Sequence, residues 1–139
     1  MEDYSRFTVK DYEFWSVQVH QDQSYLGRCV IWCKRRDAED LADANENEQQ
    51  ELFKVLQDIR KATKSAFNAE WLNYSFLGNE ARHLHGHFIP RYSSPREFNG
   101  IVFTDEQWGK NPYKGKKKDF TTTPEMLEAV RLKLTEVLG

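Results

Sequence analysis

Three of the four histidines in this chain, His83, His85 and His87, occupy alternate positions of one short apolar segment. Residues two apart on a β-strand point to the same face, so this spacing would bring the three imidazoles together. Imidazole is the side chain whose unperturbed pKa lies nearest neutrality, so three of them can divide the roles of nucleophile, proton donor and ligand. We therefore take this segment as the candidate reactive site.

Three kinds of site could use such a row of histidines. A metal site would need further ligands, but His20 is the only other histidine and no obvious carboxylate completes the set, so no metal and no cofactor is expected. A structural role is a poor explanation, because each partly buried imidazole would need its own partner. A covalent site fits better, since a neutral imidazole attacks phosphorus and the phospho-histidine formed hydrolyses readily.

The elements that would position these histidines are predicted from apolar periodicity. Residues 14–20 alternate between apolar and polar and predict a strand with one solvated face. Cys29–Cys33 is continuously apolar and predicts a more deeply buried strand. Residues 72–77 predict a third strand, and residues 82–89 form the histidine strand. The short connection between these last two predicts an antiparallel pair.

Two helices are also predicted. Asn45 and Glu48 have capping-box spacing at the start of a long helix. Its apolar stripe consists of Leu52, Val55, Leu56, Ile59, Ala66 and Phe67. Thr123 as N-cap and Pro124 in the first turn begin a final helix over residues 123–138. Between the histidine strand and the final helix, residues 93–122 lose apolar periodicity and predict a long loop. Within this loop, only Ile101–Phe103 could form a short strand.

Composition sets the broad class of the protein. The chain has 139 residues, is 39% hydrophobic and carries a net charge of −2. These values predict one domain over residues 1–139, with its core at about 14–92, and no nucleic-acid or membrane partner. The first residues lack the pattern of a signal peptide. Cys29 and Cys33 would share a strand face too far apart to bridge, which favours free core thiols and a cytoplasmic protein.

The segment from His83 to Ile89, with Pro90-Arg91 after it, resembles the signature of the histidine triad (HIT) family, and the resemblance extends over residues 14–92. It implies an α+β, HIT-like fold with an antiparallel sheet of about five strands, one long helix on one face and a C-terminal helix. The triad would line a shallow cleft on the other face. The resemblance also implies a homodimer, formed through the long helix and a central strand so that the two sheets become continuous.

The resemblance implies nucleotide chemistry as well. His85 would be the nucleophile that attacks the α-phosphorus of a nucleoside phosphate. His87 would contact the phosphate and help the leaving group, and His83 would organise the site. The substrate would be a dinucleoside polyphosphate or a nucleoside phosphoramidate, making the chain a hydrolase. The nucleotidyltransferase branch has glutamine where this chain has His87.

Three positions depart from the pattern of the family. Gly27-Arg28 stands where the family has Gly-His, and Arg28 could pair with phosphate. If it faces the site, it should depress the pKa of nearby His83. Arg36 stands where several members have histidine, and Gly86 replaces a commoner apolar residue, which weakens the strand but permits close backbone approach. Arg28 and Gly86 favour the alternative, a nucleotide-binding regulatory or scaffold protein with little turnover.

Other polar and aromatic residues are candidates for binding. Asn79 is either a turn-forming residue or an amide that contacts phosphate or ribose. His20 is either a surface residue at a strand end or a ribose ligand. Lys114–Lys118 could attract a polyphosphate or could simply be solvated. Trp108 and Tyr113 could stack on a base or pack the loop against the domain.

Overall fold

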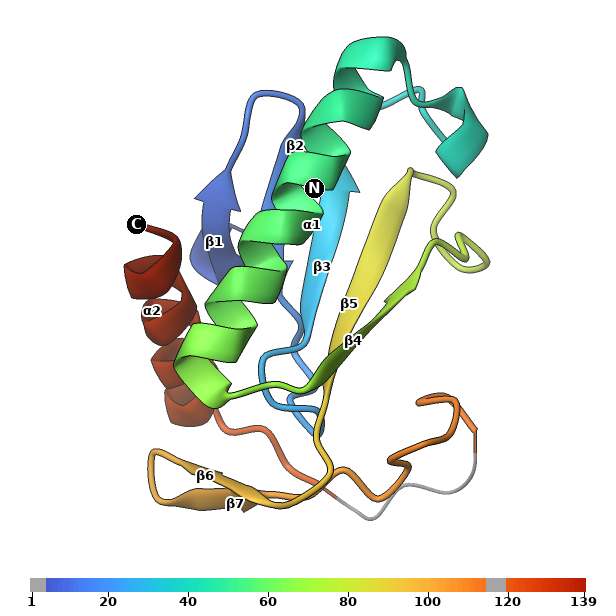
Figure 1. Cartoon of the computed structure of the whole chain (residues 1–139). Coiled ribbons are helices and arrows are strands. Elements are labelled where there is room, and N and C mark those ends of the chain that lie inside the picture. The colour runs from blue at the N-terminus through green and yellow to red at the C-terminus, as the bar shows by residue number, and fades with distance from the viewer. Residues whose placement is uncertain (1–4, 115–119) are drawn as a thin grey trace.

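A five-stranded antiparallel sheet forms the centre of the computed structural model, which describes residues 5–114 and 120–139 (Figure 1). Its strands, in spatial order, are β1 (Thr8–Asp11), β2 (Trp15–Val19), β3 (Cys29–Cys33), β5 (His85–Arg91) and β4 (Trp71–Ser75). The histidine strand β5 therefore lies between β3 and β4, and β4 is an edge strand. The predicted α+β class, sheet size and antiparallel pairing of β4 with β5 are confirmed.

Helix α1 (Glu46–Phe67) crosses one face of this sheet (Figure 1). The predicted capping box is present, because Asn45 Oδ1 accepts the Glu48 N–H and the Glu48 carboxylate accepts the Asn45 N–H, each at 2.9 Å. Helix α2 (Pro124–Leu138) packs beside α1 and against β1, with Thr123 as its N-cap as predicted. Two short 3₁₀ helices span Ser5–Phe7 and Leu41–Asp43. No helix in the described ranges is long and apolar enough to cross a membrane.

The core lies between the sheet and the two helices. Leu52, Val55 and Ile59 of α1 are buried against the inner faces of β2 and β3. Both Cys29 and Cys33 are buried and free, as predicted. Burial raises the pKa of the Cys29 thiol to about 12, so this sulfur stays protonated and behaves as an apolar group.

Two strands, β1 and β6 (Arg96–Phe98), were not expected from the sequence. The edge strand β1 is only four residues long, pairs with β2 through an irregular register and carries little periodicity. Within the predicted loop 93–122, β7 (Ile101–Phe103) does form a strand, but it pairs with β6 (Arg96–Phe98) in a separate hairpin. Such short segments depend on their partners more than on their own residues.

The segment after this hairpin is held to the sheet by the buried Arg91. Its guanidinium donates to both carboxylate oxygens of Asp105, at 2.7 and 3.1 Å. It also donates to Asn73 Oδ1 at 2.7 Å, and to the carbonyls of Gln107 at 2.6 Å and Lys110 at 2.8 Å. A buried cation needs such complete pairing. Residues 105–110 therefore have a fixed position above the end of β5.

Candidate functional site

His85 and His87 project from β5 on the face of the sheet opposite α1. In the register of β3 and β5, His85 lies opposite Trp32 and His87 lies opposite Val30. The intervening Gly86 faces the helical side. His83 lies just before β5 rather than within the predicted strand, yet its ring centroid is 5.4 Å from that of Trp32. The structure therefore places His83 and His85 against one indole, and the ring centroid of His87 lies 5.3 Å from that of His85.

A cleft of about 480 Å³ lies beside these side chains. It is lined by Phe7, Gln18, Val19, His20, Gln21, Asp22, Val30, Trp32, His85 and His87. The lining thus combines apolar and aromatic side chains with the imidazoles of His20, His85 and His87. This combination suits a ligand with a flat ring and a polar tail.

The tautomer of His85 is set by a main-chain carbonyl. Its Nδ1 lies 2.7 Å from the carbonyl oxygen of His83, and because a carbonyl only accepts, Nδ1 carries the proton. In the neutral ring, Nε2 then holds the lone pair. The ring also stacks on Trp32, with centroids 4.3 Å apart and an interplanar angle of 24°. These two contacts fix an imidazole with a nucleophilic nitrogen at the edge of the cleft.

His83 is held in a similar way on its other nitrogen. Its Nε2 donates to the carbonyl oxygen of Cys33 at 2.5 Å, while its own carbonyl accepts from His85. The cleft lining does not include His83. His83 therefore contacts His85 through its main-chain carbonyl and lies outside the lining of this cleft.

Arg28 is next to His87, and this contact corrects the sequence-based expectation that its neighbour would be His83. Arg28 Nη2 lies 3.5 Å from Nδ1 of His87. Guanidinium can only donate, so Nδ1 accepts and Nε2 of the neutral His87 ring carries the hydrogen. Burial, and then the charges of Arg28 and His85, lower the pKa of His87 to about 4. At neutral pH, His87 is an uncharged donor.

The guanidinium of Arg28 lacks a complete set of partners. The residue is only 7% exposed, and its Nε is buried without a hydrogen-bond partner. None of the ion pairs among the described residues includes it. Burial lowers the pKa of Arg28, and Tyr113, Asp22 and Tyr25 act in the opposite direction. A buried cation in this state favours an anionic ligand.

His20 completes the row of rings. Its centroid lies 5.7 Å from that of His87, and its Nδ1 accepts the N–H of Asp22 at 2.9 Å, which leaves Nε2 as the donor of the neutral ring. Burial, and then the charges of Arg28 and His87, lower the pKa of His20 to about 4. A neutral N–H facing the cleft can bind a ribose hydroxyl or a phosphate oxygen.

Gln23 positions both His20 and Arg28, and sequence reasoning missed it. Its buried amide donates to the carbonyls of His20 at 2.8 Å and Arg28 at 2.9 Å, and it accepts the N–H of Gly27 at 2.8 Å. A single polar residue in a turn carries no signal of this role in one sequence. The cleft contacts of Trp32 were missed for a different reason, because its strand is apolar throughout.

The remaining predicted binding residues are not brought together with the triad. Asn79 is exposed in the turn between β4 and β5 and is not among the residues lining the cleft. Lys114 is exposed, and residues 115–118 of the lysine segment lie outside the described residues. In the described part of the chain, no group of three His, Cys, Asp or Glu side chains could hold a metal ion.

Gly86 is required by the packing of a neighbouring ring. A Cβ added to Gly86 would overlap the ring of Phe76, which fills the space on the helical side of β5. The close approach expected from this glycine is thus present, and Phe76 supplies the apolar bulk that the strand itself lacks. With the Phe76 ring in the space that a side chain at position 86 would take, His85 and His87 both remain in a regular strand.

Comparison with known proteins gives the following similarities. The model of the HIT domain family matches residues 10–94. No curated protein matches the chain. Among solved structures, a histidine triad protein from Sinorhizobium meliloti 1021 superposes with a TM-score of 0.75 at 20% identity, covering 94% of this chain and 87% of that one.

Two further structures agree with this fold. A histidine triad protein from Marinobacter aquaeolei VT8 has a TM-score of 0.75 at 21% identity, with 94% of this chain and 87% of that chain covered. A hypothetical histidine triad nucleotide-binding protein from Sulfolobus tokodaii strain 7 has a TM-score of 0.70 at 21% identity, with 95% and 83% covered. At these identities the likeness establishes the HIT-like fold.

Proposed function

The chain belongs to the HIT domain family, and from this membership and the geometry of the cleft we propose that it is a nucleotide hydrolase. It attacks the α-phosphorus of a dinucleoside polyphosphate or nucleoside phosphoramidate. The observation that carries the proposal is the bond from Nδ1 of His85 to the His83 carbonyl, which leaves Nε2 free to attack. This attack forms the His85–phosphorus bond and expels the leaving group, and water then hydrolyses the nucleotidyl-histidine.

The other site residues would share the remaining work. The base and ribose would lie in the cleft between Phe7 and Trp32, with His20 as a donor to the sugar or phosphate. His87 would donate through Nε2–H to a phosphate oxygen, and Arg28 would neutralise its charge. Stacking on Trp32 would favour His85 in the intermediate, where the substituted ring gains positive character.

The test is to measure turnover and the intermediate together. Purified protein is given adenosine phosphoramidate or diadenosine triphosphate, and product release is followed in the steady state. In parallel, the reaction is quenched within one turnover and the intact protein mass is measured. We expect AMP to be released and one adenylyl group to appear on the protein. Turnover without this adduct would reject the covalent path.

The second candidate is a nucleotide-binding regulatory or scaffold protein with little turnover. It is favoured by the contact of Arg28 with His87. Because the pKa of His87 is lowered to about 4, its ring is neutral at pH 7 and is a weak proton donor to a leaving group. Tight binding of AMP with neither turnover nor adduct on both substrates would decide for this candidate.

We also propose a homodimer, formed through α1 and the free edge of β4. Leu52, Val55 and Ile59 are used by the core of one chain, whereas Phe53 of α1 is 65% exposed and Tyr74 of β4 is 42% exposed. Light scattering at micromolar concentration should give twice the chain mass, and Phe53→Glu should give a monomer. Leu132→Glu on α2 is the control, and a monomeric wild type would reject the dimer.

A further inference from the structure

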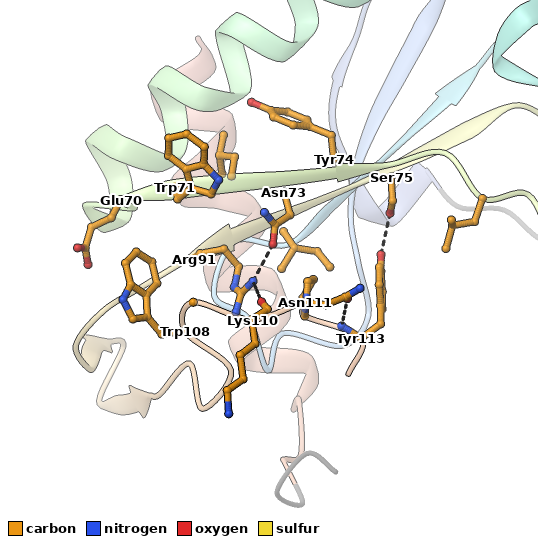
Figure 2. A pocket seen from close by; sticks show the side chains of 15 residues that line it. Glu70, Trp71, Asn73, Tyr74, Ser75, Arg91, Trp108, Lys110, Asn111 and Tyr113 are labelled. Atoms are coloured by element: carbon orange, nitrogen blue, oxygen red, sulfur yellow. Dashed lines mark hydrogen bonds between the residues drawn. The ribbon is translucent and has the colours of Figure 1, made fainter. Parts of the chain in front are cut away.

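A second cavity, larger than the histidine cleft, lies outside that cleft. It has a volume of about 1040 Å³ and lies between the edge strand β4 and the segment 108–113 (Figure 2). In the register of β4 and β5, Ser75 lies opposite His87 and Asn73 lies opposite Ile89. Residues opposite each other share a face, so Asn73 and Ser75 line the cavity from the triad side of the sheet, while Leu72 and Tyr74 line it from the other side of β4.

Two tryptophans stand at one end of this cavity. Trp71 from β4 is 66% exposed and Trp108 from the loop is 43% exposed. Figure 2 shows both indoles at the end of the cavity away from Ser75 and Tyr113. Neither indole is in a ring contact with another described residue. Exposed indoles gathered at a cavity are typical of binding sites for flat rings, including nucleobases.

The cavity is preformed. Arg91 ties β5 to the carbonyls on either side of Trp108, at Gln107 and Lys110, and to the carboxylate of Asp105. Figure 2 shows this guanidinium between Asn73 and the main chain at Lys110. A ligand would therefore bind beside a loop that is already held in place. Binding would not have to order this loop, which lowers its entropic cost.

The other end of the cavity lies near the histidines, to which Tyr113 and Arg28 connect it. Tyr113 and Ser75 are joined by a hydroxyl hydrogen bond of 2.9 Å. Arg28 lies over the Tyr113 ring, 5.9 Å from its centroid, and also contacts His87. From Ser75 to Trp71 the strand runs about 13 Å. This span is of the size that separates a reacting phosphorus from the base of a diphosphate leaving group.

We propose that this cavity is a second binding site, which takes the nucleobase of the leaving group between Trp71 and Trp108. The proposal rests on the hydrolase function proposed above and narrows its substrate to a nucleotide with a base at each end. The first base occupies the histidine cleft, the phosphates pass Arg28 and Tyr113, and the second base reaches the indoles. A phosphoramidate with a small amine has no group for this site.

The experiment compares two substrates in three variants. Trp71→Ala and Trp108→Ala each remove one indole, and Leu132→Ala removes an exposed apolar side chain from α2 as the control. For diadenosine triphosphate, we expect each tryptophan variant to lower kcat/KM by about tenfold. For adenosine phosphoramidate, kcat/KM should be unchanged in all three. Equal losses on both substrates, or no loss on either, would overturn the second site.

Direct binding separates this proposal from the hydrolase function. Diadenosine triphosphate and AMP are titrated into wild-type protein if it proves inactive, and into His85→Ala if it is active. The second site requires tighter binding of diadenosine triphosphate than of AMP, and a loss of that difference in Trp108→Ala. Equal affinities would reject the site whatever the turnover. A Trp71→Ala protein whose mass by light scattering falls would instead assign that indole to a dimer interface and also reject the site.

Discussion

Nη2 of Arg28 lies 3.5 Å from Nδ1 of His87, so a buried cation contacts the last histidine of the triad. The contact fixes the hydrogen of the neutral ring on Nε2, and the charge of Arg28 adds to burial in lowering the pKa of His87 to about 4. His87 is thereby a donor that stays uncharged at neutral pH, and the positive charge of the site resides on Arg28. The division of roles differs from one in which a histidinium supplies both charge and proton.

This division predicts a change in substrate preference when Arg28 is replaced. Arg28→His removes the fixed charge and restores the residue common in the family, so the ratio of kcat/KM for diadenosine triphosphate to that for adenosine phosphoramidate should fall about tenfold. Lys61→His, on the exposed side of α1, is the control and should leave the ratio unchanged. An unchanged ratio in Arg28→His would show that Arg28 has no part in selecting the substrate.

Loss of His85 should remove turnover and spare binding. His85→Ala lacks the attacking nitrogen, so kcat should fall by about a thousandfold or more, while the affinity for AMP changes little because His87, His20 and Arg28 remain. In His85→Gly, added imidazole should restore part of the activity, because it can occupy the space on Trp32. A His85→Ala protein with most of the wild-type activity would disprove the nucleophile assignment.

The free energy of unfolding should depend on pH through His20 and His87. Their pKa values are lowered to about 4, against about 6.5 in an unfolded chain. Between these values the unfolded state binds more protons, so the stabilisation is complete above about pH 6.5 and is lost as the pH falls towards 4. Each histidine contributes a slope of up to about 1.4 kcal/mol per pH unit.

Urea unfolding between pH 5 and 7 would measure this slope, and that range avoids Glu48, whose pKa is lowered to about 2. His20→Gln should reduce the slope without abolishing it, since His87 remains. A free energy of unfolding that is flat from pH 5 to 7 in the wild type would contradict the lowered pKa values.

The sequence predicts the parts of this site that depend on local spacing. Alternation of His85 and His87 placed both on one face of a strand, and the caps at Asn45 and Thr123 marked where the helices begin. These signals act within a few residues of one another, so they do not depend on how the sheet is assembled.

The contacts that join separate strands could not be predicted in this way. Arg28 precedes β3, at the end of that strand where Val30 lies opposite His87, whereas His83 contacts the carbonyl of Cys33 at its other end. Only the antiparallel register decides between these two neighbours. The bonds of Gln23 likewise depend on the path of a turn, which residue type alone does not specify.

Substitutions of Gly86 and Phe76 should have non-additive effects on the free energy of unfolding. Gly86→Ala places a methyl group against the Phe76 ring, so the ring or the strand must shift, and the protein should lose about 1–3 kcal/mol of stability. Because His85 and His87 flank this position, kcat should fall as well. In a Phe76→Ala background the same substitution should cost less, with a coupling of about 0.5 kcal/mol or more in a double-mutant cycle. Additive losses in the four proteins of that cycle would mean that Phe76 does not limit the residue at position 86.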